Sequence, residues 1–134
     1  MAKSRVQLGK RGEDLAAGFL RSAGCDILTA NYRCPWGEID LVARDGEELA
    51  FVEVRTRRSV AYGSPQESIT RRKAGNLVAT AQHFLQNHEP FEVDLANACK
   101  VSNEIQWRID LVSICLTKGS GSPQIDHIKY AVQS

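Results

Sequence analysis

Two strand-like runs joined by an Asp-Gly turn constrain the fold of this chain more than any other feature of its sequence. The runs cover residues 36–44 and 49–57, and Asp45-Gly46 between them favours a tight β-hairpin. Side chains alternate between the two faces of a strand, so each run places its charged residues on one face and mostly apolar residues on the other. The charged face of this hairpin is therefore the first candidate for a functional site.

Strands are also predicted on both sides of the hairpin, over residues 25–34, 107–116 and 125–132. Residues 91–105 stay ambiguous, because they alternate like a strand at first and then resemble a loop. A chain of 134 residues suits one domain, and it has no apolar run of the roughly 20 residues that cross a bilayer. We therefore expect a single domain over residues 1–134. The basic N-terminus lacks the apolar stretch of a secretory signal, which favours the cytoplasm.

Two helices complete the expected fold. The first is predicted over residues 8–23, where apolar and small residues recur at helical spacing, and Gly24 provides its end. The second should begin with Ser64 as N-cap and run to about Asn87, since Pro65 suits the first helical position. The order helix, three strands, helix, two strands predicts an α/β fold with a mixed sheet flanked by helices.

The acids Asp40 and Glu53 are brought together by either of the two loops that the turn allows. A loop at Gly46-Glu47 pairs Asp40 directly with Glu53. A loop at Asp45-Gly46 pairs Glu38 with Glu53 instead. Both registers place Asp40 and Glu53 on one face, an inference that a β-bulge would break.

Two carboxylates at opposed strand positions repel each other, so a stable hairpin requires something that offsets the repulsion. Mg²⁺ does this naturally, because it binds carboxylate oxygens and keeps water or substrate phosphate in its other positions. Arg55, two residues beyond Glu53 on the same face, adds a fixed positive charge suited to phosphate. These residues favour a metal and phosphate site, while ion pairs on an ordinary solvent-facing hairpin remain the alternative.

Residues outside the hairpin also help to decide between a metal and phosphate site and an ordinary solvent-facing surface. Glu13 interrupts a helical stripe of small residues that suits packing on the sheet, so it either joins the acids or interacts with the helix dipole. Gln66 and Lys73 recur on one side of the second helix, where Lys73 either binds phosphate or faces solvent. The four cysteines have no CxxC spacing, which favours buried thiols over a zinc site.

Positive charge is clustered, although the formal net charge is only +1. Basic residues gather at the N-terminus, at the end of the hairpin and near the start of the second helix, as Lys3, Arg5, Lys10 and Arg11, then Arg55, Arg57 and Arg58, then Arg71, Arg72 and Lys73. If folding brings these groups together, they form an anion-binding face. Otherwise each group is an ordinary solvated surface.

The combined pattern resembles a known group of nucleases. A helix carrying Glu13, followed by GEID at residues 37–40 and FVEVRTR at residues 51–57, is similar to the PD-(D/E)XK nuclease superfamily. The likeness is closer to the YraN family of predicted endonucleases, which are similar to archaeal Holliday-junction resolvases. It extends over nearly the whole chain, through GEDLAAGFL, YGSPQESIT, RID at residues 108–110 and the closing DHIKYA.

The resemblance implies a restriction-endonuclease-like fold with an αβββαβ core and Mg²⁺-dependent hydrolysis of phosphodiester bonds, with Mn²⁺ as a substitute. It implies a metal site formed by Asp40, Glu53 and the backbone carbonyl of Val54. The expected catalytic residues are Glu13, Asp40, Glu53 and Arg55. Nucleic-acid contacts are expected from Arg55, Arg57, Gln66 and Lys73. We therefore expect an endonuclease acting on DNA, with branched or structured DNA as a candidate substrate and a homodimer as a candidate assembly.

One residue departs from the superfamily pattern. Arg55 stands where a Lys is usual, and because Arg stays protonated at any working pH it cannot act as the general base proposed for that Lys. Arg55 can still stabilise charge on the phosphate, while Mg²⁺ lowers the pKa of the attacking water. The alternative is a nucleic-acid-binding protein that keeps the nuclease fold without turnover. A protein-interaction scaffold is a third, more distant alternative.

Overall fold

The computed structural model of the chain describes residues 2–57, 69–87, 106–116 and 122–132. Its elements are α1 (Ala2–Ser22), β1 (Asp26–Cys34), β2 (Gly37–Asp45), β3 (Glu48–Arg57), α2 (Arg71–Asn87), β4 (Gln106–Cys115) and β5 (Gln124–Val132). The five-stranded sheet has the order β1-β2-β3-β4-β5, in which β3 and β4 are parallel and all other neighbours are antiparallel. This mixed sheet flanked by helices confirms the expected α/β fold and its αβββαβ order.

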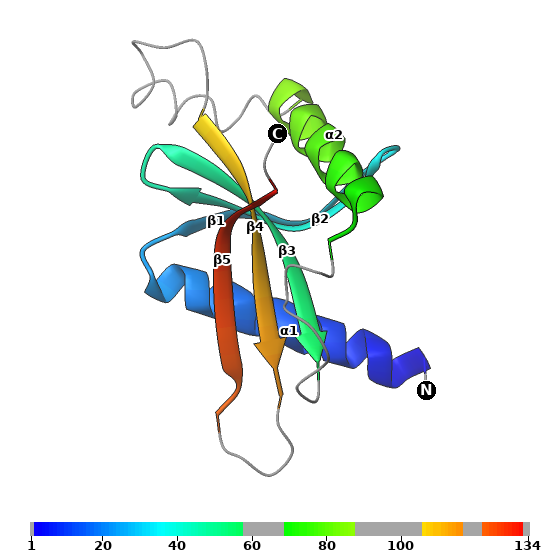
Figure 1. Cartoon of the computed structure of the whole chain (residues 1–134). Coiled ribbons are helices and arrows are strands. Elements are labelled where there is room, and N and C mark those ends of the chain that lie inside the picture. Colours follow the sequence, from blue (N-terminus) through cyan, green and yellow to red (C-terminus); the bar gives the residue numbers. More distant parts are fainter. Residues whose placement is uncertain (1, 58–68, 88–105, 117–121, 133–134) are drawn as a thin grey trace.

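The two helices cover opposite faces of the sheet (Figure 1). Under α1 the core is formed by Ala16, Ala17, Leu20, Cys25, Leu41, Ala43, Ala50, Val52, Val112 and Ile114. Under α2 it is formed by Ile39, Val42, Leu49, Phe51, Leu77, Ala81, Phe84 and Ile109. The central strands are therefore covered on both faces, and a charged side chain within them needs a specific partner. No helix in the described segments is long and apolar enough to cross a membrane.

Helix α1 ends as predicted, at the glycine that follows it. Gly24 has a φ of 97°, a left-handed conformation that glycine adopts without steric cost. The N–H groups of Gly24 and Cys25 donate to the carbonyls of Arg21 and Leu20 at 3.0 and 2.9 Å, which is the Schellman arrangement. The helix begins at Ala2 rather than at residue 8, because the residues before it contain no glycine or proline that would stop it.

Helix α2 starts later than the sequence predicts. It begins at Arg71, and the expected N-cap Ser64 lies outside the described residues. Thr70 is the cap instead, because its Oγ1 accepts a hydrogen bond from the N–H of Lys73 at 3.1 Å. Its carbonyl accepts the first helical hydrogen bond, from Ala74, at 2.8 Å. A threonine next to the helix thus provides the hydroxyl that the prediction assigned to a more distant serine. Residues 91–105, left open by the sequence, also fall outside the described segments.

The β2–β3 hairpin adopts the first of the two predicted registers. Its loop consists of Gly46 and Glu47. Gly46 has a φ of 63°, as the first position of a type II′ turn requires. The same register, continued along both strands, places Asp40 opposite Glu53.

Gly12 allows α1 to lie close to β3, and we expect that Gly12→Ala lowers the free energy of unfolding by about 1 to 3 kcal/mol. A Cβ at this position would overlap Thr56 Oγ1 and lie 2.9 Å from Thr56 Cβ, so a rotation of the stiff threonine does not relieve the contact. Gly18→Ala on the same helix is the control, because a Cβ there meets nothing within 4 Å.

The control substitution should raise stability by about 0.5 to 1 kcal/mol, since alanine favours a helix over glycine. Urea unfolding followed by circular dichroism measures both changes. If Gly12→Ala were as stable as Gly18→Ala, α1 would not rest on Thr56 as described.

Candidate functional site

Strands β2 and β3 separate beyond the hairpin, and the predicted acids lie where they part. Backbone pairing between the two strands ends at Leu41 and Val52, a point that we call the fork. Beyond the fork β2 stays paired with β1, and β3 with β4. A backbone N–H at such a point has lost its partner strand, and the N–H of Val54 donates instead to Asp40 Oδ2 at 2.7 Å. The fork therefore fixes the Asp40 carboxylate between the strands.

Strand β1 is irregular opposite the fork. Asn31 has a left-handed backbone with a φ of 55°, which asparagine tolerates better than most residues. In β2 the faces shift at the same level, because Ile39 joins the core under α2 whereas Leu41 joins the core under α1. The simple alternation that predicts Ile39 and Leu41 on one face is wrong here. The irregularity leaves Asp40 within the electrostatic reach of acids from both α1 and β3.

Asp40 and Glu53 meet at the fork, as the hairpin register predicts. Glu53 is only 8% exposed, and Asp40 forms a side-chain hydrogen bond with it. Burial, followed by the negative charge of Glu53, raises the pKa of Asp40 from 3.8 to about 8, although the Val54 N–H acts in the opposite direction. Near neutral pH Asp40 is therefore largely protonated.

Glu13 approaches the same pair from α1. Its negative charge contributes to the raised pKa of Asp40. Burial raises the pKa of Glu13 itself, against a hydrogen bond from the Asn31 side chain that lowers it. The neighbouring Gly12 seats this part of α1 against β3. We refer to Glu13, Asp40 and Glu53 as the acidic cluster.

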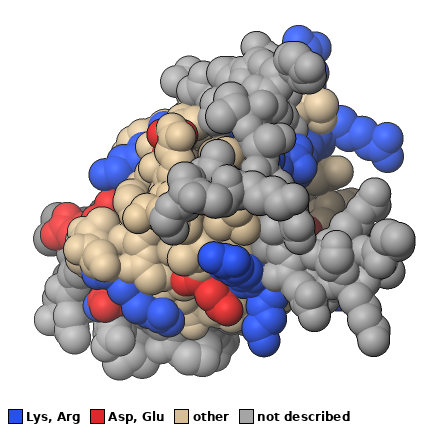
Figure 2. Space-filling model, turned by 90° about the horizontal axis from the view of Figure 1, so that it is seen from below, with Lys and Arg blue, Asp and Glu red and all other residues tan. Residues whose placement is uncertain are grey.

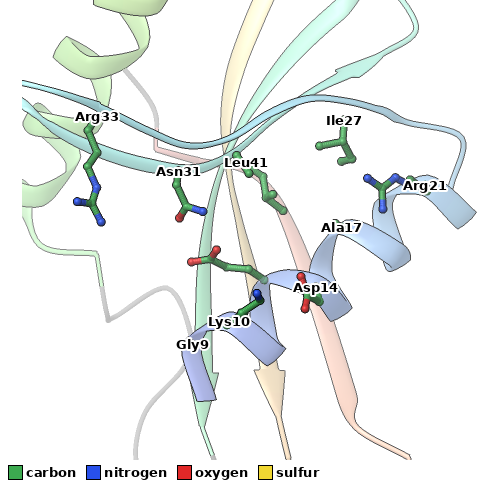
Figure 3. Close-up of a pocket in the computed structure, with 11 residues that line it drawn as sticks. Gly9, Lys10, Asp14, Ala17, Arg21, Ile27, Asn31, Arg33 and Leu41 are labelled. Carbon is green, nitrogen blue, oxygen red and sulfur yellow. The ribbon is translucent and has the colours of Figure 1, made fainter. Parts of the chain in front are cut away.

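Two hollows border the acidic cluster. The first lies between α1 and β1, has a volume of about 740 Å³ and includes Glu13 and Asn31. Figure 3 shows the side chains of Asn31 and Arg33 directed from β1 toward α1 in this hollow. The second, which we call the cleft, has a volume of about 380 Å³ and is lined by Gly37, Glu38, Asp40, Glu53, Val54, Lys73, Asn76 and Leu77. An ion pair between Arg33 and Glu38 connects the two hollows.

Lys73 reaches into the cleft from the first turn of α2. Its ammonium group forms an ion pair with the carboxylate of Glu53. The Thr70 cap fixes the backbone of Lys73 in that turn, which helps to aim its side chain. Lys73, which the sequence predicts as a phosphate contact, thus forms an ion pair with Glu53 of the cluster. A cation that binds Oε2 of Glu53 would displace this ammonium group.

Arg55 and Arg57 are half-buried at the end of β3. Arg55 stands opposite Ser113 of β4, and Arg57 donates from Nη2 to Ser113 Oγ at 3.5 Å. Arg57 is therefore directed toward β4. Gln66 lies outside the described residues. Of the predicted site residues, the structure brings together Glu13, Asp40, Glu53, Val54 and Lys73.

The donor set at the fork fits a hard divalent cation. Asp40 and Glu53 offer carboxylate oxygens, the ligands that Mg²⁺ prefers, and a cation between them would offset their mutual repulsion when both are ionised. Within the described segments, no three His, Cys, Asp or Glu side chains converge as a preformed metal cage. The side-chain ligands of an ion here would therefore be these two carboxylates, and a backbone carbonyl, water or phosphate would complete its coordination.

The thiols of the described cysteines do not contribute to this donor set. Cys25, Cys34 and Cys115 are free. Cys25 is buried as predicted, whereas Cys34 and Cys115 are only half-buried. None of the three lines either hollow.

Sequence reasoning missed the polar residues that support the acidic cluster. Asn31 hydrogen-bonds Glu13, and Asn76 lines the cleft. A signal for Asn31 was available, because asparagine is disfavoured inside strands and tolerates the left-handed conformation found there. No local signal points to Asn76, since its role depends on how α2 packs against the β1–β2 hairpin.

Comparison with known proteins shows similarity to one family over most of the chain. The model of the uncharacterised protein family UPF0102 matches residues 12–114, a range that contains the whole acidic cluster. A UPF0102 protein of Dehalococcoides mccartyi is 40% identical over 132 residues, which cover 98% of each chain. A UPF0102 protein of Arthrobacter sp. is 41% identical over 95% of this chain and 97% of the relative. A third, of Acidothermus cellulolyticus, is 42% identical over 97% and 96%.

Proposed function

This chain belongs to the uncharacterised protein family UPF0102, and we propose that it is a Mg²⁺-dependent endonuclease that hydrolyses phosphodiester bonds in DNA. The observation that carries the proposal is the convergence of Asp40 and Glu53 at the fork, where the pKa of Asp40 rises to about 8. Two acids held this closely in a partly buried place destabilise a metal-free protein. A divalent cation bound between them would remove that cost.

The residues around the fork divide the proposed reaction among them. Asp40 and Glu53 would hold the metal ion, with the carbonyl of Val54 as the third protein ligand. Bound Mg²⁺ would supply a water of lowered pKa and stabilise negative charge on the phosphate. Lys73, once released from Glu53, would bind a phosphate oxygen. Glu13 would hold a water beside Asp40, since its carboxylate lies close enough to raise the pKa of that residue.

Lys73 can supply the ammonium group that β3 lacks, because β3 has an arginine at position 55. An ammonium group is absent from β3 at the place where the resembled superfamily has it, but Lys73 brings one to Glu53 from α2. A lysine is a compact point charge, whereas Arg55 offers a planar guanidinium that binds two phosphate oxygens at once. We therefore assign the contact at the metal site to Lys73 and a supporting phosphate contact to Arg55.

A polyanionic substrate fits the distribution of positive charge. Gly12 of α1, which follows Lys10 and Arg11, contacts Thr56 of β3. Because side chains alternate along a strand, Arg55 and Arg57 lie on the opposite face from Thr56, the face on which Glu53 meets Lys73 of α2. Figure 2 views the molecule from below Figure 1 and shows Lys and Arg side chains together with acidic ones on that face. Such a mixed surface suits phosphate contacts around an acidic centre better than it suits a uniformly basic track. Branched or otherwise structured DNA is the substrate that we propose.

A second candidate function is nucleic-acid binding without turnover. The ion pair between Lys73 and Glu53 favours it, because an ammonium group already neutralises an acid that a metal ion would otherwise need. This alternative predicts salt-sensitive DNA binding, since phosphate contacts release counterions, and no products with any divalent metal ion.

The proposal is tested by incubating the protein with a four-way junction and with linear duplex DNA, in Mg²⁺, in Mn²⁺ and in EDTA. We expect cleavage with either metal ion and none in EDTA. Glu53→Gln should remove cleavage, whereas Asp26→Asn should keep it, because Asp26 is an exposed acid paired with Arg44 away from the fork. Cleavage by the Glu53→Gln variant at the wild-type rate would overturn the metal assignment. Binding without cleavage in every metal ion would favour the second candidate.

A further inference from the structure

The hairpin that joins β1 and β2 carries an exposed aromatic ring next to the cleft. Trp36 is 59% exposed, whereas Trp107 is half-buried and packs edge-on against Phe51 with ring centroids 5.7 Å apart. We propose that Trp36 is a stacking platform for an unpaired base of the substrate, an inference that rests on the proposed function. It narrows the substrate class to DNA with unpaired or splayed bases.

The tip of this hairpin is held firmly against α2. A Cβ on Gly37 would lie 3.3 Å from Thr80 Oγ1, so the tip packs tightly against the helix. The thiol of Cys34 donates to Thr80 Oγ1 at 3.7 Å, and that hydroxyl donates to the carbonyl of Asn76 at 2.7 Å. Figure 1 shows the β1–β2 hairpin beside the first turns of α2. A ring presented from such a fixed position loses little conformational entropy when a base stacks on it.

Trp36 lies within reach of a nucleotide chain whose phosphate occupies the cleft. The next two residues, Gly37 and Glu38, line the cleft together with Asp40. Four residues of extended chain span at most about 14 Å, which sets the limit for the separation of Trp36 and Asp40. Stacked DNA advances about 3.4 Å per base, so this limit corresponds to roughly four nucleotides. A base near the cut site can therefore meet the ring while its strand passes the acidic cluster.

The chemistry of the tip favours a base over an apolar protein surface. Only Trp36 and Tyr130 are strongly exposed large hydrophobic residues within the described segments, and the Tyr130 hydroxyl is engaged by Glu48. The hairpin that carries Trp36 also carries the charged pair Arg33 and Glu38, at opposed positions near its tip. A flat ring with a cation nearby suits a nucleotide, because the base can stack on the ring while the phosphate lies near the cation. Paired bases inside a duplex do not expose the face that stacks.

Intrinsic fluorescence provides the test, because the chain has only two tryptophans. Trp107→Phe leaves Trp36 as the sole tryptophan, and the difference between wild type and Trp36→Leu gives the same signal should the Trp107 variant fold poorly. In EDTA, single-stranded oligothymidylate is expected to quench Trp36, whereas a long blunt duplex at equal nucleotide concentration is not. Trp36→Leu should weaken single-strand binding about 5- to 150-fold, and Trp36→Tyr should retain most of it.

The outcomes separate this inference from the proposed function. Unchanged emission with single-stranded DNA, or equal affinity of the Trp36→Leu variant, overturns the stacking platform even if the wild type cuts DNA. Quenching without any metal-dependent cleavage leaves the platform in place and removes the nuclease. A Trp36→Leu variant that changes the oligomeric state, without changing DNA affinity, shows instead that the tip contacts a second copy of the chain.

Discussion

Asp40→Asn is expected to remove Mg²⁺-dependent cleavage and yet to make the metal-free protein more stable. Cleavage should fall by more than about 100-fold, since even outer-shell partners of metal ligands typically account for about 10- to 100-fold. At pH 9 in EDTA the free energy of unfolding should rise by about 2 to 4 kcal/mol. Asparagine keeps an oxygen that accepts the Val54 N–H but cannot carry the charge that repels Glu53.

The sign of the stability effect follows from the direction of the pKa shift. The pKa of Asp40 is raised from 3.8 to about 8 by burial and then by Glu53, so the folded protein binds the proton more tightly than the unfolded chain does. Stability from Asp40 is complete below the unfolded pKa and is lost as pH rises through the folded one, at no more than about 1.4 kcal/mol per pH unit. Water still reaches Asp40, which reduces the total loss.

Urea unfolding in EDTA at a series of pH values between 4 and 9 measures this effect. The wild type should lose stability more steeply than Asp40→Asn does as pH rises from 4 to about 8, and the difference should level off above that value. Asp26→Asn is the matched control, because its exposed carboxylate pairs with Arg44 and its removal should leave the pH profile as in the wild type. Parallel profiles for wild type and Asp40→Asn would mean that Asp40 is not held against Glu53.

A residue that lowers the stability of the metal-free protein but is required for cleavage marks a place where function and stability conflict. Asp40 fits that description only if both halves of the prediction hold. Lower activity together with lower stability would instead describe an ordinary structural residue. The comparison of the two measurements on one variant is therefore more informative than cleavage alone.

The sequence predicts the hairpin and its acids well because the information for them is local. Asp45-Gly46 restricts the loop to two choices, and either choice brings Asp40 and Glu53 to one face. The structure adopts the Gly46-Glu47 loop. Strand bounds elsewhere agree to within a residue or two, since alternation and turn residues define them.

The parts that could not be predicted depend on contacts between distant segments. The fork arises because β3 stays paired with β4 while β2 stays paired with β1. The sequence of neither strand alone predicts this separation. The contact of Lys73 with Glu53 depends on where α2 begins. The observed cap at Thr70 places Lys73 in the first turn of the helix, whereas the predicted cap at Ser64 does not. The role of Glu13 likewise depends on the close approach of α1 to Thr56.

Arg108→Met is expected to lower the free energy of unfolding by about 3 to 5 kcal/mol. Arg108 is only 4% exposed, and its Nε donates to both carboxylate oxygens of Asp110 at 3.0 Å. Its other nitrogens donate to Glu48 at 3.0 Å and to Asp45 at 2.9 Å. One guanidinium group thus joins β4 to both ends of the hairpin loop. Without it, the fully buried Asp110 loses the two hydrogen bonds and the positive charge that offset its burial.

Asp110 is held from the other side by β5, which is why the loss of Arg108 should be felt across the sheet. His127 Nε2 lies 2.8 Å from Asp110 Oδ2, and the N–H of Tyr130 donates to Oδ1 at 3.2 Å. Tyr130 has a left-handed backbone with a φ of 55°, a conformation that is uncommon for a bulky residue. The RID and DHIKYA segments therefore form a structural network that ties β4 and β5 to the hairpin, on residues separate from the acidic cluster.

Three matched variants distinguish this network from an ordinary set of surface ion pairs. Arg44→Met removes the exposed pair with Asp26 and should cost only about 0 to 1 kcal/mol. Arg108→Lys should restore little of the stability that Arg108→Met loses, because a lysine lacks the planar guanidinium group that contacts three carboxylates. Arg108→Met combined with Asp110→Leu should regain part of the loss, since the buried unpaired charge is then absent.

Urea unfolding of these variants, together with Asp110→Leu alone, gives the coupling energy between Arg108 and Asp110. If Arg108→Met cost no more than Arg44→Met, the guanidinium would not be supporting the buried acid. The network holds Asp45 and Glu48, the residues that flank the Gly46-Glu47 loop, and that loop sets the register that places Asp40 opposite Glu53. Arg108→Met should therefore also reduce cleavage at temperatures where the variant stays folded, whereas Arg44→Met should not.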